Sequence, residues 1–163
     1  MRVLVLGSLR SGGLNEALAA TVEREAAGMA DVVRFAGLER LPLYTTDLDA
    51  EGVHDQVDRL RREVRAADAV AIVTPEHNAM PSAAVKNALD LASRPLGDAP
   101  LAGKPVAVMS ASPTPGGGRR AIAALLAGLG SARAVPVEAT VSVPAAHERR
   151  DGEGGYDAAV GAD

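Results

Sequence analysis

The sequence has no cysteine and no tryptophan, and it contains only one phenylalanine and two tyrosines among 163 residues. Without cysteine, the chain has no disulfides, thiolate nucleophiles or cysteine-ligated zinc and iron–sulfur sites. A disulfide-stapled secreted mini-domain is excluded for the same reason. Because so few aromatic rings are available, a flat ligand would have to be held mainly by backbone contacts rather than by stacking.

Long apolar runs and a basic excess are also missing. The apolar stretches are too short and interrupted to span a membrane, and the run Val3–Leu6 leads directly into Gly7, which predicts a buried strand rather than a signal peptide. The 17 Lys and Arg are outnumbered by 21 Asp and Glu, for a net charge of −4. This balance argues against nucleic acid as the main partner. We therefore expect a cytoplasmic protein that binds neither nucleic acid nor membrane.

Short apolar runs alternate with amphipathic segments along most of the chain. Strands are predicted at 3–6, 31–36, 69–73, 106–110 and 134–143, and helices at 15–27, 53–67, 83–93 and 119–129. This alternation implies right-handed βαβ units and a parallel sheet. Five strands with helices on both faces favour a flavodoxin-like, three-layer α/β/α sandwich with strand order 2-1-3-4-5 over the Rossmann order.

The domain organisation follows from the same pattern. Residues 1–143 form one predicted domain, and residues 38–49 and 74–82 are expected to be loops. The charged, glycine-rich segment 144–163 is expected to be a poorly ordered tail.

The loop after the first strand has the composition of an anion-binding turn. It joins a strand to a helix and combines glycines, Ser8, Ser11 and Arg10, so backbone N–H groups at the helix N-terminus can face an anion. It is not a GxGxxG turn, because Leu9 occupies the second glycine position, and Gly13-Leu14 replaces the Lys-Ser/Thr of a Walker A loop. Rossmann-type NAD binding and ATP binding are disfavoured, while phosphate binding and a plain glycine-rich turn both stay open.

Two further loops follow strands at the same expected edge of the sheet. Residues 74–82 contain Pro75 and Pro81, which restrict the backbone so that its polar groups can be presented to the edge of a planar heterocycle. Residues 110–119 are rich in glycine and, taken alone, are typical of a flexible surface turn.

Three stretches together resemble a known family. They are Gly7-Ser8-Leu9-Arg10 through Asn15, Pro75-Glu76-His77-Asn78, and Lys86-Asn87-Ala88-Leu89-Asp90. In these stretches the chain is similar to the NADPH-dependent FMN reductases, which include flavin, quinone, chromate and azo-dye reductases. The resemblance implies noncovalently bound FMN, NADPH or NADH as electron donor, a small-molecule electron acceptor, and a homodimer or homotetramer.

The resemblance also assigns site residues by position. It implies that the first loop holds the FMN phosphate, that the second lines the isoalloxazine edge, and that the third borders the other side of the flavin. The implied cofactor-binding residues are Ser8, Arg10, Ser11, Gly13, Leu14, Asn15, Pro75, Glu76, His77, Asn78, Ser112, Gly116 and Gly117.

The chain departs from the family pattern at two of these positions. Serine is usual where Gly13 stands, although Ser11 could supply the missing hydroxyl, and tyrosine is usual where His77 stands. His77 is the one candidate catalytic residue, as a proton donor to a reduced quinone, because histidine is a common proton-transfer side chain, or else it is an ordinary surface histidine. His54 and His147 lie outside the three loops, so no metal site is expected.

The resemblance implies an enzyme that passes two electrons by a ping-pong route, from NAD(P)H through FMN N5 to a flavin, quinone or similar acceptor. A flavodoxin-like electron carrier is an alternative, although the scarcity of aromatic rings fits it less well. A biosynthetic tailoring relative with an altered flavin site is another, kept open by Gly13, His77 and the short C-terminal region.

Overall fold

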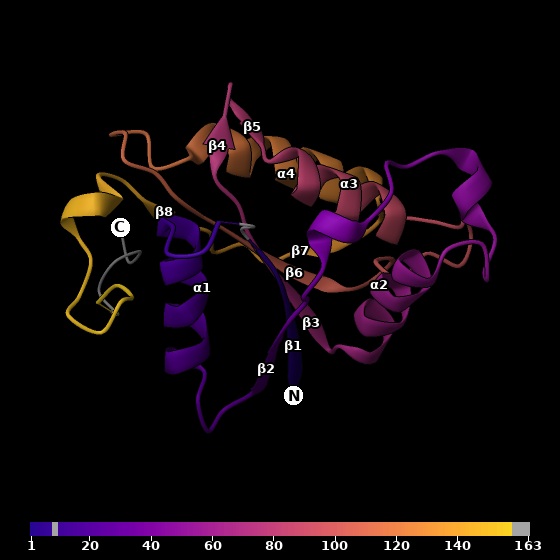
Figure 1. Ribbon diagram of the computed structural model, residues 1–163, viewed down its shortest axis with the longest axis horizontal. Helices are drawn as coiled ribbons and strands as arrows, with labels where there is room; N and C mark the ends of the chain where they lie inside the picture. The colour runs from indigo at the N-terminus through magenta and orange to yellow at the C-terminus, as the bar shows by residue number, and fades with distance from the viewer. Residues whose placement is uncertain (8–9, 158–163) are drawn as a thin grey trace.

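The computed structural model describes residues 1–7 and 10–157, and its centre is a parallel sheet (Figure 1). The strands that form it are β1 (Arg2–Leu6), β2 (Asp31–Arg34), β3 (Ala69–Val73), β6 (Pro105–Ala111), β7 (Val135–Pro136) and β8 (Val141–Val143). The order is β2-β1-β3-β6, and β7 and β8 both pair with β6 in the fifth position. The predicted flavodoxin-like order 2-1-3-4-5 is confirmed, with the fifth strand in two short parts.

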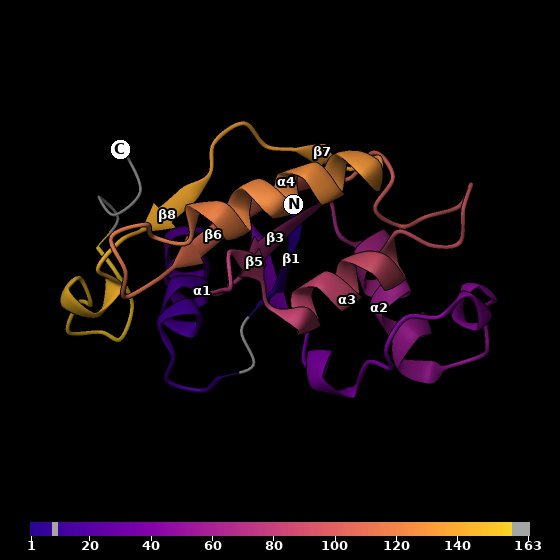
Figure 2. The ribbon, with the colours of Figure 1, turned by 90° about the horizontal axis from the view of Figure 1, so that it is seen from above.

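Within the described residues, four helices cover the sheet. They are α1 (Leu14–Glu25), α2 (Asp55–Ala66), α3 (Ala83–Ala92) and α4 (Arg119–Ser131). Figure 1 shows α1 on one side of the strands and α2 and α3 on the other, and in Figure 2 α4 runs across β6 from near β8 to near β7. Side chains alternate accordingly, since Val5 packs in the cluster around α1 whereas Leu4 and Leu6 belong to the opposite core.

The second predicted loop contains a small hairpin instead of irregular chain. Strands β4 (Glu76–His77) and β5 (Met80–Pro81) pair antiparallel. The turn residues Asn78 and Ala79 both have positive φ, at 52° and 66°. Two such residues are typical of a type I′ turn, which usually carries glycine at the second position. The loop expected at 38–49 forms two 3₁₀ turns, η1 (Leu38–Arg40) and η2 (Thr46–Asp49).

The expectation of a poorly ordered C-terminal segment is wrong for residues 144–157. The chain forms a 3₁₀ turn, η3 (Ala146–Glu148), and then turns back onto α1. Tyr156 is completely buried and joins Ala146 in the apolar cluster with Val5 and Val143. Composition suggested disorder because the segment is charged and rich in glycine, but one large apolar side chain and a set of polar contacts to α1 hold it in place.

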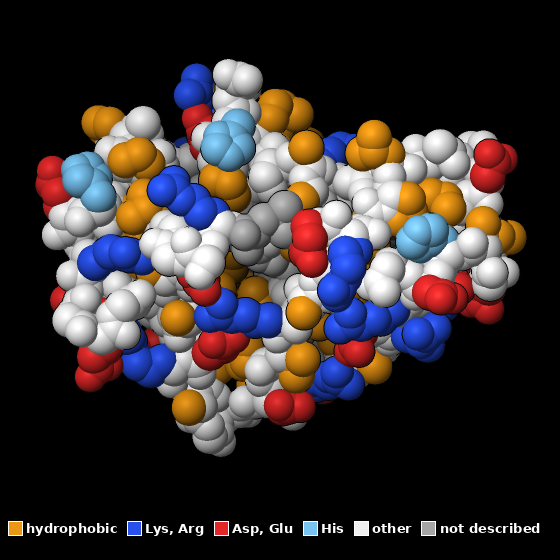
Figure 3. Space-filling view, viewed as in Figure 1, with side chains coloured by type: hydrophobic (Ala, Val, Ile, Leu, Met, Phe, Trp, Pro, Cys, Tyr) orange, Lys and Arg blue, Asp and Glu red, His pale blue; other side chains and the backbone are white. Residues whose placement is uncertain are grey.

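Two surface properties bear on partners. Within residues 1–7 and 10–157, no helix is both long and apolar enough to cross a membrane. Figure 3 shows Lys and Arg side chains interspersed with Asp and Glu across one face of the molecule.

Candidate functional site

The first loop leads from β1 into the N-terminus of α1. Gly12 adopts a left-handed conformation at φ 69°, and the Gly13 N–H donates to the Arg10 carbonyl at 3.2 Å. Gly13 is the N-cap of α1 and provides no side-chain cap, while the Glu16 carboxylate accepts from the Gly12 N–H. The loop therefore presents the start of a helix, with its partial positive charge, beside an exposed arginine. Ser8, also assigned to this loop, lies outside the described residues.

A hollow of about 410 Å³ lies between this loop and the hairpin. It is lined by Arg10, Gly13, Leu14, Asn15, Pro75, His77, Ser82, Ala83 and Ala84. Six of these residues were assigned to the site from sequence. The structure thus brings the first and second loops together around one space, even though about sixty residues separate them in the chain.

Asn15 is 5% exposed, and its side chain joins α1 to β6. Its amide Nδ2 donates to the Ala111 carbonyl, and the Ala111 N–H donates to its Oδ1, both at 2.9 Å. This pair satisfies both backbone groups at the end of β6, which would otherwise be buried without partners. The side-chain oxygen of Asn15 is therefore committed to the fold, and a nearby anion would meet the backbone at this position.

The Glu76 side chain contacts the start of α4. Its carboxylate accepts from Arg120 Nη2 at 2.5 Å, from Arg120 Nε at 2.9 Å and from the Arg120 N–H at 3.1 Å. The Ala121 N–H also donates to it, at 3.4 Å. Glu76 therefore caps α4 and ties the hairpin to that helix. Partial burial raises the pKa of Glu76, but Arg120 and the backbone N–H groups outweigh burial and the pKa is lowered overall.

Replacing Glu76 with glutamine is expected to lower Tm by a few degrees near neutral pH, because the charge at the α4 N-terminus is lost. A carboxylate whose pKa is lowered on folding stabilises the protein above its unfolded pKa and ceases to do so as the pH falls through its folded value. The difference in Tm between the two proteins should therefore shrink as the pH drops below 4.5, the ordinary pKa of glutamate. Thermal unfolding followed by circular dichroism across this range measures the effect. Glu138→Gln, at an exposed glutamate, serves as control; a pH-independent difference for Glu76→Gln would contradict the prediction.

The third loop contributes no residue to the described lining of the hollow. The Ser112 hydroxyl bonds to Thr114 within its own loop, at 2.9 Å to the Thr114 hydroxyl. Gly117 is buried at φ 59°, and its carbonyl accepts from Ser142 Oγ at 3.1 Å. Among the residues assigned from sequence, Ser11, Glu76, Asn78, Ser112, Gly116 and Gly117 are also absent from the described lining.

Several residues that the sequence motifs did not indicate also shape this region. Ser82, Ala83 and Ala84 bring the N-terminus of α3 to the hollow, and Ser82 caps that helix by accepting from the Val85 N–H at 3.4 Å. A serine just before an apolar helical stretch is the usual signal of an N-cap, so the start of this helix could be predicted from the sequence. Arg120 carried no comparable signal, since it lies 44 residues from Glu76.

Comparison of the sequence with known proteins identifies its family. The sequence profile of the NADPH-dependent FMN reductase family matches residues 1–148. The chain belongs to this family. The resemblance stated from its motifs is thereby confirmed.

Individual relatives are similar to this chain over most of its length. It is 41% identical over 115 residues to a quinone reductase from Pseudomonas putida, and 41% identical over 119 residues to one from Escherichia coli strain K12. The matches cover 71% and 72% of this chain but 61% and 63% of those relatives, so the chain spans less than two thirds of their length. Among solved structures it is similar to the flavoenzyme NAD(P)H:(acceptor) oxidoreductase FerB from Paracoccus denitrificans, with a TM-score of 0.82 and 30% identity over 95% of this chain and 85% of that one.

The described residues also bear on metal binding. Residues 1–7 and 10–157 contain no group of three or more His, Asp or Glu side chains that could hold a metal ion.

Proposed function

We propose that this chain binds FMN in the hollow between the first loop and the hairpin and acts as an NAD(P)H-dependent reductase of a small-molecule acceptor such as a quinone or a flavin. The observation that carries the proposal is the hollow itself. It is lined by the start of α1 and Arg10 at one side and by Pro75 and His77 at another. Membership of the FMN reductase family supports the same assignment.

The lining residues fit a phosphorylated flavin. Arg10 and the first-turn N–H groups of α1 suit a phosphate, because a helix N-terminus and a guanidinium both favour an anion. Leu14, Pro75 and Ala83 supply apolar surface for a flat ring system. The first loop leaves little space for a bulkier residue at Gly13, where a Cβ atom would lie 3.0 Å from the Arg10 carbonyl.

In the proposed mechanism the protein binds the FMN, orients it and shelters it. FMN, when bound, would supply hydride chemistry at N5, and in the proposed ping-pong order NAD(P)H would leave the site before the acceptor enters it. Arg10 and the start of α1 would hold the phosphate, and backbone groups of the hairpin that begins at Glu76 would line the ring edge. The family resemblance adds Ser8, Ser11, Asn78, Ser112, Gly116 and Gly117 to the proposed set of cofactor-binding residues. Glu76 acts by holding the hairpin on α4, as its four accepted hydrogen bonds indicate.

His77 is the proposed proton donor to the reduced acceptor. Its side chain is exposed at the hairpin and also lines the hollow, so it could pass a proton between solvent and an acceptor bound there. A flavodoxin-like electron carrier is the weaker candidate, because no described lining residue carries an aromatic ring other than this imidazole. A cytoplasmic location and a homodimer or homotetramer also belong to the proposal, and exposed apolar side chains such as Leu43 and Leu96 are compatible with self-association.

Adding FMN to the purified chain is expected to give the shifted visible spectrum and quenched fluorescence of bound flavin. NADPH added without air should then bleach the absorbance in one step, with no transient long-wavelength band, and a quinone should restore it. Failure to bind FMN would overturn the proposal. Binding with a slow, two-step reduction would favour the electron carrier instead.

A further inference from the structure

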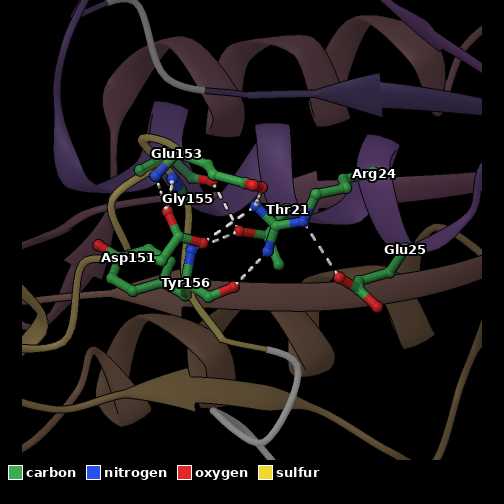
Figure 4. Close-up of polar contacts among 8 residues, drawn as sticks. Thr21, Arg24, Glu25, Asp151, Glu153, Gly155 and Tyr156 are labelled. Carbon is green, nitrogen blue, oxygen red and sulfur yellow. Dashed lines mark hydrogen bonds and ion pairs between the residues drawn. The ribbon is translucent and has the colours of Figure 1, made fainter.

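The C-terminal strap, residues 150–156, lies against the loop that starts α1. Figure 4 shows how it is anchored: Arg24 on α1 donates to the Asp151 carboxylate at 3.0 Å and to the Tyr156 carbonyl at 2.6 Å. The Tyr156 N–H donates to Thr21 Oγ1 at 2.8 Å. The Asp151 carboxylate also accepts from the N–H groups of Glu153 and Gly155, at 2.9 and 2.7 Å, which closes the strap into a turn.

The contacts between the strap and α1 leave no space for a side chain at Gly155. A Cβ atom on Gly155 would lie 2.7 Å from Thr21 Oγ1 and 2.8 Å from Arg24 Nη1. Partial burial raises the pKa of Asp151, but its backbone N–H donors and Arg24 outweigh burial and lower it. The strap is thus a built contact with α1, and it lies beyond residue 148, where the family match ends.

From this anchor the strap reaches three consecutive carbonyl groups at the start of α1. Arg150 Nη2 donates to the Gly12 carbonyl at 3.2 Å and to the Gly13 carbonyl at 3.3 Å. The Tyr156 hydroxyl donates to the Leu14 carbonyl at 3.1 Å. Arg150 and Tyr156 also form an antiparallel bridge, so the two donors are held together.

Fixing these carbonyls fixes the N–H groups of the same peptide units. A trans peptide is planar, so its N–H points opposite to its carbonyl, and holding the Gly13 carbonyl sets the direction of the Leu14 N–H. Gly12 and Gly13 would otherwise be the most flexible part of the loop. The Arg150 guanidinium also places a positive charge beside the Gly12 and Gly13 carbonyl groups.

We propose that Arg150 is a positioning residue for the cofactor phosphate, which orders the Gly12-Gly13 turn and adds positive charge beside it. The inference rests on the proposed FMN site and assigns part of its affinity to a segment outside the family match. Because a loop ordered in advance loses less entropy when it binds its ligand, the contribution is expected in the affinity for the phosphate.

The test compares FMN with riboflavin, which has the same ring but no phosphate, in fluorescence titrations of the full chain. Arg150→Met is expected to weaken FMN binding by about tenfold, in line with the loss of a charged hydrogen-bonding group, and to leave riboflavin binding unchanged. Arg149→Met, at the exposed neighbouring arginine, should change neither affinity. Arg150→Lys keeps the charge but not the forked donor and should give an intermediate loss for FMN alone.

The outcomes separate this inference from the proposed function. If the unaltered chain binds FMN and Arg150→Met binds it equally well, or if both flavins weaken together, the positioning role is overturned and the proposed function stands. If the unaltered chain binds no FMN, the proposed function fails and the inference fails with it. Should Arg150→Met not fold, the ratio of FMN to riboflavin affinity in Arg150→Lys decides, and an unchanged ratio overturns the role.

Discussion

Replacing Tyr156 with alanine is expected to lower the free energy of unfolding by about 3–5 kcal/mol, the range for removing a large buried aromatic side chain. Tyr156 is 0% exposed and packs with Val143 and Ala146 beside α1. Its loss would leave a cavity where the strap meets the sheet and would release the Leu14 carbonyl from its hydroxyl donor. Urea denaturation followed by circular dichroism measures the change.

Tyr156→Phe is the matched control, because it keeps the ring and removes only the hydroxyl. We expect it to cost about 1 kcal/mol, the usual net value of one hydrogen bond. If the alanine variant were as stable as the phenylalanine variant, the packing of residues 144–157 against α1 would contribute nothing to the fold, contrary to the burial of this side chain.

Replacing Gly118 with alanine is expected to destabilise the protein by about 2–5 kcal/mol, the sum of left-handed backbone strain and overpacking. Gly118 is the N-cap of α4 at φ 81°. A Cβ atom there would collide with the Ser110 hydroxyl and lie 2.6 Å from Ser110 Cβ. Ser110 is completely buried on β6 and has little space to move, so the third loop would have to shift. Thermal and urea unfolding measure the loss.

Gly130→Ala tests whether the effect belongs to the position rather than to the residue type. Gly130 lies in the same helix and does not have a positive φ, and a Cβ atom at this position would meet no neighbouring side chain or strand within 4 Å. Alanine there should stabilise the helix by up to about 1 kcal/mol. Similar destabilisation by both substitutions would show that the close approach of α4 to β6 is not what requires glycine at 118.

The fold was predictable because its signals are local. Each buried parallel strand appears as a short apolar run such as 69–73, and the strand and helix spacing repeats along the chain. The element ends differ from the predicted ones by a few residues in places, since caps and fraying decide them rather than periodicity. The hairpin at 76–81 escaped prediction because its turn uses Asn78-Ala79 without the glycine that usually marks such turns.

The candidate site was predictable in its position but not in the roles of its side chains. Sheet topology places loops that follow adjacent strands at one edge, which is why Arg10 and Pro75 were expected near each other and line one hollow. It does not say where a side chain finds its hydrogen-bond partners. Asn15 bonds to Ala111, 96 residues away, and Glu76 bonds to Arg120, and the motif alone indicated neither contact.

The sequence by itself determined the sheet order, the family and the loops that carry the proposed cofactor site, because hydrophobic periodicity and motif spacing are properties of neighbouring residues. Only the tertiary structure decided that the charged C-terminal segment packs on α1 and that Arg150 contacts Gly12, 138 residues away. A composition rich in glycine and charge indicates only that a segment has little apolar surface of its own to bury. Whether it orders depends on the partners that folding brings to it, here Thr21 and Arg24 on a helix near the other end of the chain.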